Sequence, residues 1–200
     1  MSVNCNAVNI YDSLIHCKGE TVLPGLRDQA YGIPKSAIIK WPTLAKPTDD
    51  GATMESIASY KGEFTLAADA KWLKIDLIDT ASNITSASQG DKPSKTFINS
   101  GTLKYAGNNE AATGFARMAN TDDLIYVVQQ RDGKFRVLGN RMFSTNTNPG
   151  QESGMAVTDA SGTTLEISVT DVCPAPFYIG KLLTEDGVLD CATGELEAAA

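Results

Sequence analysis

Residues 108–139 read NNEAATGFARMANTDDLIYVVQQRDGKFRVLG, and the middle of this stretch decides the fold. In an extended chain, alternate side chains point to opposite faces. Apolar side chains occupy both faces here, with Leu124, Tyr126 and Val128 on one and Ile125 and Val127 on the other. A strand of this kind is stable only when both faces are covered. We therefore predict a buried strand with a layer of structure on each side.

The residues before this strand predict a short amphipathic helix over 109–119. Asn108 can cap its first turn, and Phe115 and Met118 fall on the same helical face as Ala111. A glycine inside the helix lowers its propensity by about 1 kcal/mol relative to alanine, so packing must stabilise it. We expect the helix to cover one face of the buried strand.

The pair Asp132-Gly133 after the buried strand is typical of a two-residue type I′ turn. Such a turn joins two antiparallel strands and fixes how their residues pair. It predicts that Gln130 lies opposite Phe135.

Half-buried strands are predicted elsewhere by apolar residues that alternate with polar ones, at 64–68, 73–77 and 165–169. With 42% hydrophobic residues the chain can bury a substantial core. The fold class expected is mainly β: a β-barrel or sandwich with one flanking α-helix and a long polar hairpin loop.

The domain organisation follows from where these patterns begin and end. Residues 1–35 lack a sustained period and contain prolines and glycines, so we expect an N-terminal arm. Residues 36–180 are expected to form the β-barrel or sandwich domain. Residues 181–200 are expected to form a C-terminal extension.

The segment 81–101 is rich in Ser, Thr, Asn, Gly and Lys and contains few large apolar residues. Long loops without secondary structure are uncommon in compact domains and are usually functional, or disordered until they bind. We expect this segment to be mobile in the free molecule and to become ordered on binding, because it has too little apolar surface to fix itself.

The charge balance argues against some functions. The chain has 17 basic and 24 acidic residues, a formal net charge of −7, whereas binding DNA or an anionic membrane over a whole surface requires clustered Lys and Arg. No apolar stretch approaches the roughly 20 residues that span a bilayer. The first 20 residues also lack the pattern of a secretory signal, so we expect synthesis in the cytoplasm and no membrane partner.

The search for chemistry finds no catalytic constellation, so we expect no enzyme, no cofactor and no metal. His16 is the only histidine, and phosphate-binding glycine motifs are absent. The cysteines at 5, 17, 173 and 191 are expected to be free thiols; a disulfide between the termini and a zinc site from distant residues are the alternatives. Trp41 and Trp72 are expected in the core, although either residue can in principle stack on a sugar.

Four runs resemble the major tail, or tail tube, proteins of tailed bacteriophages and prophages: LAADAKWLKIDLID, SQGDKPSKTF, the stretch 108–139 and DVCPAPFYIG. The resemblance extends from about residue 24 to residue 180. In that family a β-barrel or sandwich with a flanking helix forms six-fold rings, which stack into a tube through which the genome passes. The resemblance thus implies a virion protein of the phage tail, made in the host cytoplasm.

The resemblance also implies roles and partners. The arm would brace subunits, and helix 109–119, with Phe115 and Met118, would pack beside a subunit boundary. The partners would be copies of the chain, the tape-measure protein and the tail terminator or baseplate proteins, and DNA would pass without sequence-specific contact. The loop would meet the next ring through Gln89, Gly90, Asp91, Lys92 and Lys95.

A channel that passes DNA must not hold it, because each Lys–phosphate contact adds affinity. We therefore expect an acidic bias on the channel wall. The acids on predicted strands that are candidates for this wall are Glu63, Asp69, Asp76 and Glu166. The alternative functions are a head–tail connector, a capsid decoration protein and a carbohydrate-binding β-sandwich.

Overall fold

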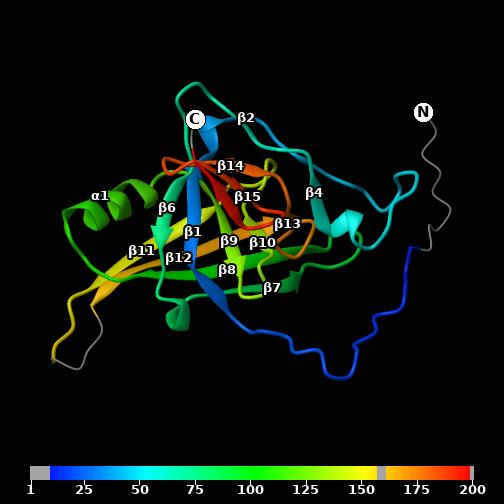
Figure 1. Cartoon of the computed structure of the whole chain (residues 1–200), viewed down its shortest axis with the longest axis horizontal. Helices are drawn as coiled ribbons and strands as arrows, with labels where there is room; N and C mark the ends of the chain where they lie inside the picture. Colours follow the sequence, from blue (N-terminus) through cyan, green and yellow to red (C-terminus); the bar gives the residue numbers. More distant parts are fainter. Residues whose placement is uncertain (1–9, 157–160, 199–200) are drawn as a thin grey trace.

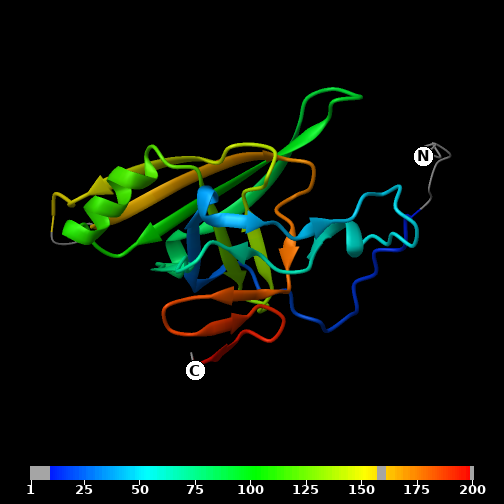
Figure 2. The same cartoon turned by 90° about the horizontal axis from the view of Figure 1, so that it is seen from above.

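The computed structural model describes residues 10–156 and 161–198. Most of its regular structure is β-strand, and the predicted mainly-β class with one α-helix is confirmed within these residues; the sheets stack as a sandwich and do not close into a barrel (Figures 1 and 2). The largest sheet, called the central sheet here, contains in spatial order β3 (Thr43–Leu44), β4 (Ser59–Lys61), β13 (Phe177–Tyr178), β10 (Phe135–Leu138), β9 (Leu124–Gln130), β1 (Leu26–Pro34) and β6 (Leu73–Asp76).

A second sheet, called the polar sheet here, covers one face of the central sheet. Its strands in spatial order are β11 (Asn146–Glu152), β12 (Gly162–Asp171), β8 (Thr96–Tyr105) and β7 (Asn83–Gln89). The remaining elements are β2 (Ile38–Lys40), β5 (Thr65–Leu66), β14 (Lys181–Leu183), β15 (Val188–Asp190), β16 (Glu195–Glu197), α1 (Glu110–Ala119) and the short 3-10 helices Lys35–Ala37, Ser56–Ala58 and Asp79–Ala81.

Strand β9 is buried on both faces, as its sequence predicts. Tyr126 and Val128 face the polar sheet, while Ile125 and Val127 face the opposite side, and all four side chains are completely buried. The layer facing Tyr126 is mainly the polar sheet, where Leu165 and other apolar residues pack inward. The expectation that the helix is the main cover is wrong: α1 packs chiefly on β11 and β12, and its end adds only Ala119 and the half-buried Phe115 to this core.

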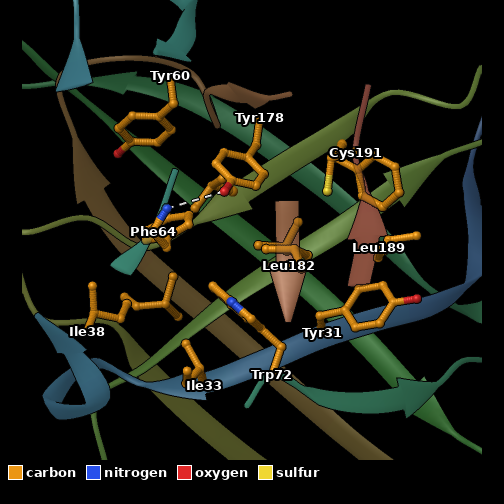
Figure 3. Close-up of a cluster of buried hydrophobic side chains, with 14 residues drawn as sticks. Tyr31, Ile33, Ile38, Tyr60, Phe64, Trp72, Tyr178, Leu182, Leu189 and Cys191 are labelled. Carbon is orange, nitrogen blue, oxygen red and sulfur yellow. Dashed lines mark hydrogen bonds between the residues drawn. The ribbon is translucent and has the colours of Figure 1, made fainter. Parts of the chain in front are cut away.

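An aromatic cluster covers the other face of β9 (Figure 3). Its centre is Phe64, whose ring lies 5.1–5.4 Å from the rings of Trp41, Trp72 and Tyr178. Such tilted and edge-to-face pairs add stability beyond area burial. The Tyr178 hydroxyl donates to the carbonyl of Lys181 at 3.0 Å, which satisfies the polar end of a buried ring.

The C-terminal segment belongs to this second cover, so its assignment as an extension is wrong. Strands β14, β15 and β16 form an antiparallel sheet, and Leu182, Leu189 and Cys191 from this segment enter the aromatic-side core. Three-residue strands carry too little periodicity to be recognised in the sequence. Tertiary packing of two leucines and one cysteine fixes them instead.

The N-terminal arm is shorter than predicted. Strand β1 pairs with β9 on one side and β6 on the other, so residues 26–34 are an interior part of the central sheet. Gly32 in β1 packs against Tyr126 and Ile75, which leaves little apolar patterning to reveal the strand. Within the described residues the arm comprises 10–25, and it runs away from the body as a largely exposed trace (Figure 1).

The β9–β10 hairpin differs from the prediction by one residue. Phe135 pairs with Gln129, not with Gln130, and the loop contains Arg131, Asp132 and Gly133. Gly133 has φ +91°, the left-handed conformation that closes a three-residue loop at a bulge. A contact outside the hairpin favours the longer loop, because the Arg131 guanidinium donates to Asp79 at 2.7 Å.

Phe64→Ala should destabilise the protein by about 3–5 kcal/mol, because it removes the ring at the centre of the aromatic cluster and leaves a cavity. The measurement is urea denaturation followed by tryptophan fluorescence. Ile39→Ala is the control, since that side chain is 69% exposed and its loss should change the free energy of unfolding by less than about 0.5 kcal/mol. Equal effects of the two substitutions would show that the cluster does not hold this layer in place.

Candidate functional site

The outward face of the polar sheet is the most distinctive surface of the molecule. The strand register places Glu166 beside Thr102, and Ser168 beside Ser100. Since the alternate residues Leu103, Leu165 and Ile167 are buried inward, these side chains point outward. The surface called the polar face here consists of Asn83, Thr85, Ser100, Thr102, Asn146, Asn148, Glu166 and Ser168. It carries hydroxyls, amides and the carboxylate of Glu166. At one end of the same outward face, Lys104 and Glu152 form an ion pair.

The polar sheet has an open edge on each side. Strands β7 and β11 are its outermost strands, and no strand of the described residues pairs with their outer edges. Open edges expose unpaired backbone N–H and C=O groups and are templates for pairing with another chain. Three antiparallel pairings separate the two edges, so β7 and β11 run in opposite directions.

The segment 81–101 is not a structureless loop. Residues 83–89 pair one to one with 96–102 across β7 and β8, and the hairpin projects beyond the rest of the sheet (Figure 2). Only residues 90–95 form its turn. Of the predicted inter-ring residues, Gly90, Asp91, Lys92 and Lys95 are exposed on this turn, and Gln89 is half-buried at its base.

Side-chain hydrogen bonds replace apolar packing in this hairpin. The Gln89 amide donates to the Thr170 hydroxyl at 3.0 Å, and the Ser86 hydroxyl donates to Asn99 at 2.7 Å. Asn99 is completely buried and donates onward to the Cys173 carbonyl at 3.0 Å. The expectation that this segment is too polar to fix itself is therefore wrong for its two strands.

A buried carboxyl lies at the root of the hairpin. Asp171 ends β12 opposite Phe97 and is only 1% exposed. Its Oδ1 accepts from the Val172 amide at 2.6 Å, while its Oδ2 has no hydrogen-bond partner within the described residues. Burial raises the pKa of Asp171 above its ordinary value of 3.8, and hydrogen bonds from Val172 and Asn140 oppose that shift.

Helix α1 lies over β11 and β12 at one end of the polar sheet. Asn109, not Asn108, is its N-cap: the Asn109 side chain accepts from the Ala112 amide at 2.9 Å. Phe115 is half-buried against the core. Met118 is 59% exposed, so it does not pack inside the subunit, and its predicted role beside a subunit boundary stays a prediction.

The four predicted channel acids do not share a face. Glu166 belongs to the polar face, whereas Asp76 on β6 projects from the opposite side of the central sheet, because its neighbour Ile75 points toward the polar sheet. Glu63 and Asp69 are exposed in the segment that carries Phe64 and covers the aromatic side. Sequence alternation placed each acid on a surface, but it contained no information on which layer each strand enters.

The residues considered for other chemistry are not brought together. Trp72 is 1% exposed, so it offers no open ring face for a sugar, and Trp41 is half-buried with its ring 5.4 Å from that of Phe64. Cys17 is an exposed free thiol, and Cys191 is buried; Cys5 lies outside the described residues. Burial raises the pKa of the free thiol of Cys173 to about 11. Across residues 10–156 and 161–198, no group of three His, Cys, Asp or Glu side chains is placed to hold a metal ion.

Comparison with protein-family models, curated proteins and solved structures finds no match to this chain. Among the described residues, no helix has the length and apolar character needed to cross a membrane. The functional argument therefore depends on the geometry of this molecule.

Asp171→Asn should increase the free energy of unfolding relative to wild type, and this increase should be larger at pH 7 than at pH 4.5. A carboxyl whose pKa is higher in the folded than in the unfolded chain costs stability as pH rises through the folded value, and an amide does not titrate. Urea denaturation of both proteins at both pH values tests this, with the exposed Glu166→Gln as control. The same difference from wild type at pH 4.5 and pH 7 would contradict it.

Phe115→Ala should cost about 1–2 kcal/mol, less than for a fully buried ring, because Phe115 is only half-buried. Met118→Ala, on the exposed side of the same helix, should change the free energy of unfolding by less than about 0.5 kcal/mol. Chemical denaturation of the two variants measures both. A larger effect at position 118 would mean that the helix packs through its other face.

Proposed function

We propose that this chain is the subunit of a phage tail tube: a virion protein that assembles into closed rings, which stack to form the conduit for DNA. The resemblance of its sequence to major tail proteins suggested this function. The strongest structural support for it is the open polar sheet, whose two edge strands, β7 and β11, run in opposite directions.

The edges are complementary in a ring. When copies are related by rotation about one axis, β7 of one copy meets β11 of the next and runs antiparallel to it. This contact is heterologous, and repeating it around the axis closes a ring and leaves no open edge in the polar sheets. The alternation of strand direction then continues across every subunit boundary.

The polar face would form the channel wall in such a ring. Hydroxyl and amide side chains form hydrogen bonds with water, and the one lysine of this sheet, Lys104, is paired with Glu152 and so is not free to displace counterions from the phosphates. The wall proposed here is thus nearly uncharged. Glu166 is the only one of the four acids considered from the sequence that belongs to this face, because Asp76 projects from the far side.

The β7–β8 hairpin supports stacking of the rings. It projects beyond the sheet and ends in a turn that exposes Asp91, Lys92 and Lys95 (Figure 2). Charges of both signs at an exposed tip favour a specific polar contact over non-specific adhesion. The partners of the assembled tube would be the tape-measure protein and the terminator or baseplate proteins at its ends.

Electron microscopy of the purified protein tests the proposal. Negative-stain images over a range of protein concentrations should show rings with a central channel and stacked tubes. Single rings that never stack would indicate a head–tail connector instead. A chain that stays monomeric at every concentration in mass photometry would overturn the proposal of self-assembly.

Replacing residues 90–95 by Asn-Gly should leave the fold and the rings intact and prevent long tubes. Gln89 and Thr96 are paired, so a two-residue type I′ turn can join them directly. A six-residue Gly-Ser turn is the matched control that keeps length and removes charge. Tube length in micrographs is the measurement, and wild-type tubes from the shortened hairpin would rule out its role in stacking.

A further inference from the structure

An apolar groove of about 390 Å³ lies where α1 approaches the edge of the central sheet. Its apolar lining includes Leu73 and Ile75 from β6, Ala111 and Phe115 from α1, and Leu165 from β12. Strand β6 is the outermost strand of the central sheet, so the outer edge of Leu73–Asp76 is open within the described residues. The amides on either side of this stretch are already bonded, that of Trp72 to Leu183 and that of Ile78 to Lys104. The groove therefore offers backbone hydrogen-bonding groups beside an apolar cleft, the combination that binds an extended peptide by strand addition.

The same chain carries an extended segment with uncovered apolar side chains. In the arm, Tyr11, Leu14 and Ile15 are 89%, 92% and 83% exposed. Large apolar side chains clustered on an exposed segment usually mark an interaction site. The Asp12 amide lies 3.5 Å from the Met54 sulfur, and this contact leaves the three side chains uncovered.

We propose that the arm of a neighbouring copy binds in this groove as an added strand beside β6, an inference that rests on the ring proposed above. In an extended chain Tyr11 and Ile15 point to the same side and lie about 13 Å apart. The four residues Leu73–Asp76 of β6 present an edge of similar length. Tyr11 and Ile15 would enter the groove while Ser13, between them, approaches its mouth.

The positions of arm and groove favour a neighbour over the arm's own subunit. The arm joins β1 near the end of β6, and in both views it runs away from the body in the direction opposite to α1 (Figures 1 and 2). An arm that points away from the groove of its own subunit can reach a neighbouring copy in the proposed ring. The 16 residues 10–25 reach about 50 Å when extended, comparable with a body about 40 Å across.

A labelled peptide of residues 10–25 tests the inference on the full-length protein. The acceptor is the Ile15→Asp chain, whose own arm should no longer fill the groove. Fluorescence anisotropy should show saturable binding of the wild-type peptide and at least tenfold weaker binding of the Ile15→Asp peptide. Adding Ala111→Glu to the acceptor should also weaken binding at least tenfold, because it places a charge in the groove.

Ala111→Glu suits this purpose because position 111 is exposed in the first helical turn, where an acidic side chain stabilises the helix. Met118→Glu, on the exposed part of the same helix, is the matched control and should leave binding unchanged. Thermal unfolding monitored by circular dichroism establishes that each acceptor is folded. Absent binding, or equal binding to the acceptor with and without Ala111→Glu, would overturn the inference.

Assembly separates this inference from the proposed function. Full-length Ile15→Asp protein should form fewer or shorter tubes than wild type, as should Ala111→Glu. If both variants form wild-type tubes, the arm does not bind here and the tube proposal stands. If the wild-type protein forms no tubes but the peptide binds the groove, the arm inference stands and the tube proposal fails.

Discussion

The burial of β9 on both faces is the constraint on which the rest of this structure depends. Because Ile125 and Val127 point away from Tyr126 and Val128, no single layer can remove all four side chains from water. The chain meets this requirement with two covers from distant segments. One is the polar sheet, built from residues 83–105 and 146–171. The other combines the aromatic cluster around Phe64 with the strands β14 and β15, so segments far apart in the sequence are needed to complete the core.

This arrangement decides what remains available for function. The central sheet is used on both faces, whereas the polar sheet packs only through its inner face and leaves its outer face and two edges unused. An isolated sheet with open edges is a liability unless it is covered or paired with another chain. The hairpin keeps its shape through bonds such as Gln89 to Thr170 and Asn99 to Cys173, so it can project a rigid polar tip without an apolar core of its own.

The sequence predicted those parts of the fold in which the pattern of buried residues is visible within one short stretch of the chain. The double-sided pattern at 124–128, the helix and the mainly-β class follow from periodicity alone. The strands at 83–89 were missed because their partners are Ser, Thr and Asn, which form the buried network with Asn99 and line the polar face. The register of the β9–β10 hairpin was missed because Asp-Gly fits both a two-residue and a three-residue turn, and the Arg131–Asp79 contact favours the longer one. The face of the molecule on which Asp76 or Glu166 lies depends on sheet topology, and a local sequence pattern does not contain that information.

The separation of these acids changes how the net charge of −7 relates to the proposed channel. Most of the excess charge need not line a wall that DNA passes. Asp76 projects from the face of the central sheet that points away from the polar sheet, and Glu63 and Asp69 lie on that same side of the molecule. A wall of hydroxyls and amides, whose one lysine, Lys104, is paired with Glu152, neither releases counterions nor repels phosphates strongly. Its hydrogen bonds can be satisfied by water at every position of the passing duplex. Sliding of the duplex then depends more on how uniform the surface is than on the sign of its charge. Short neutral side chains repeated in register on adjacent strands provide that uniformity.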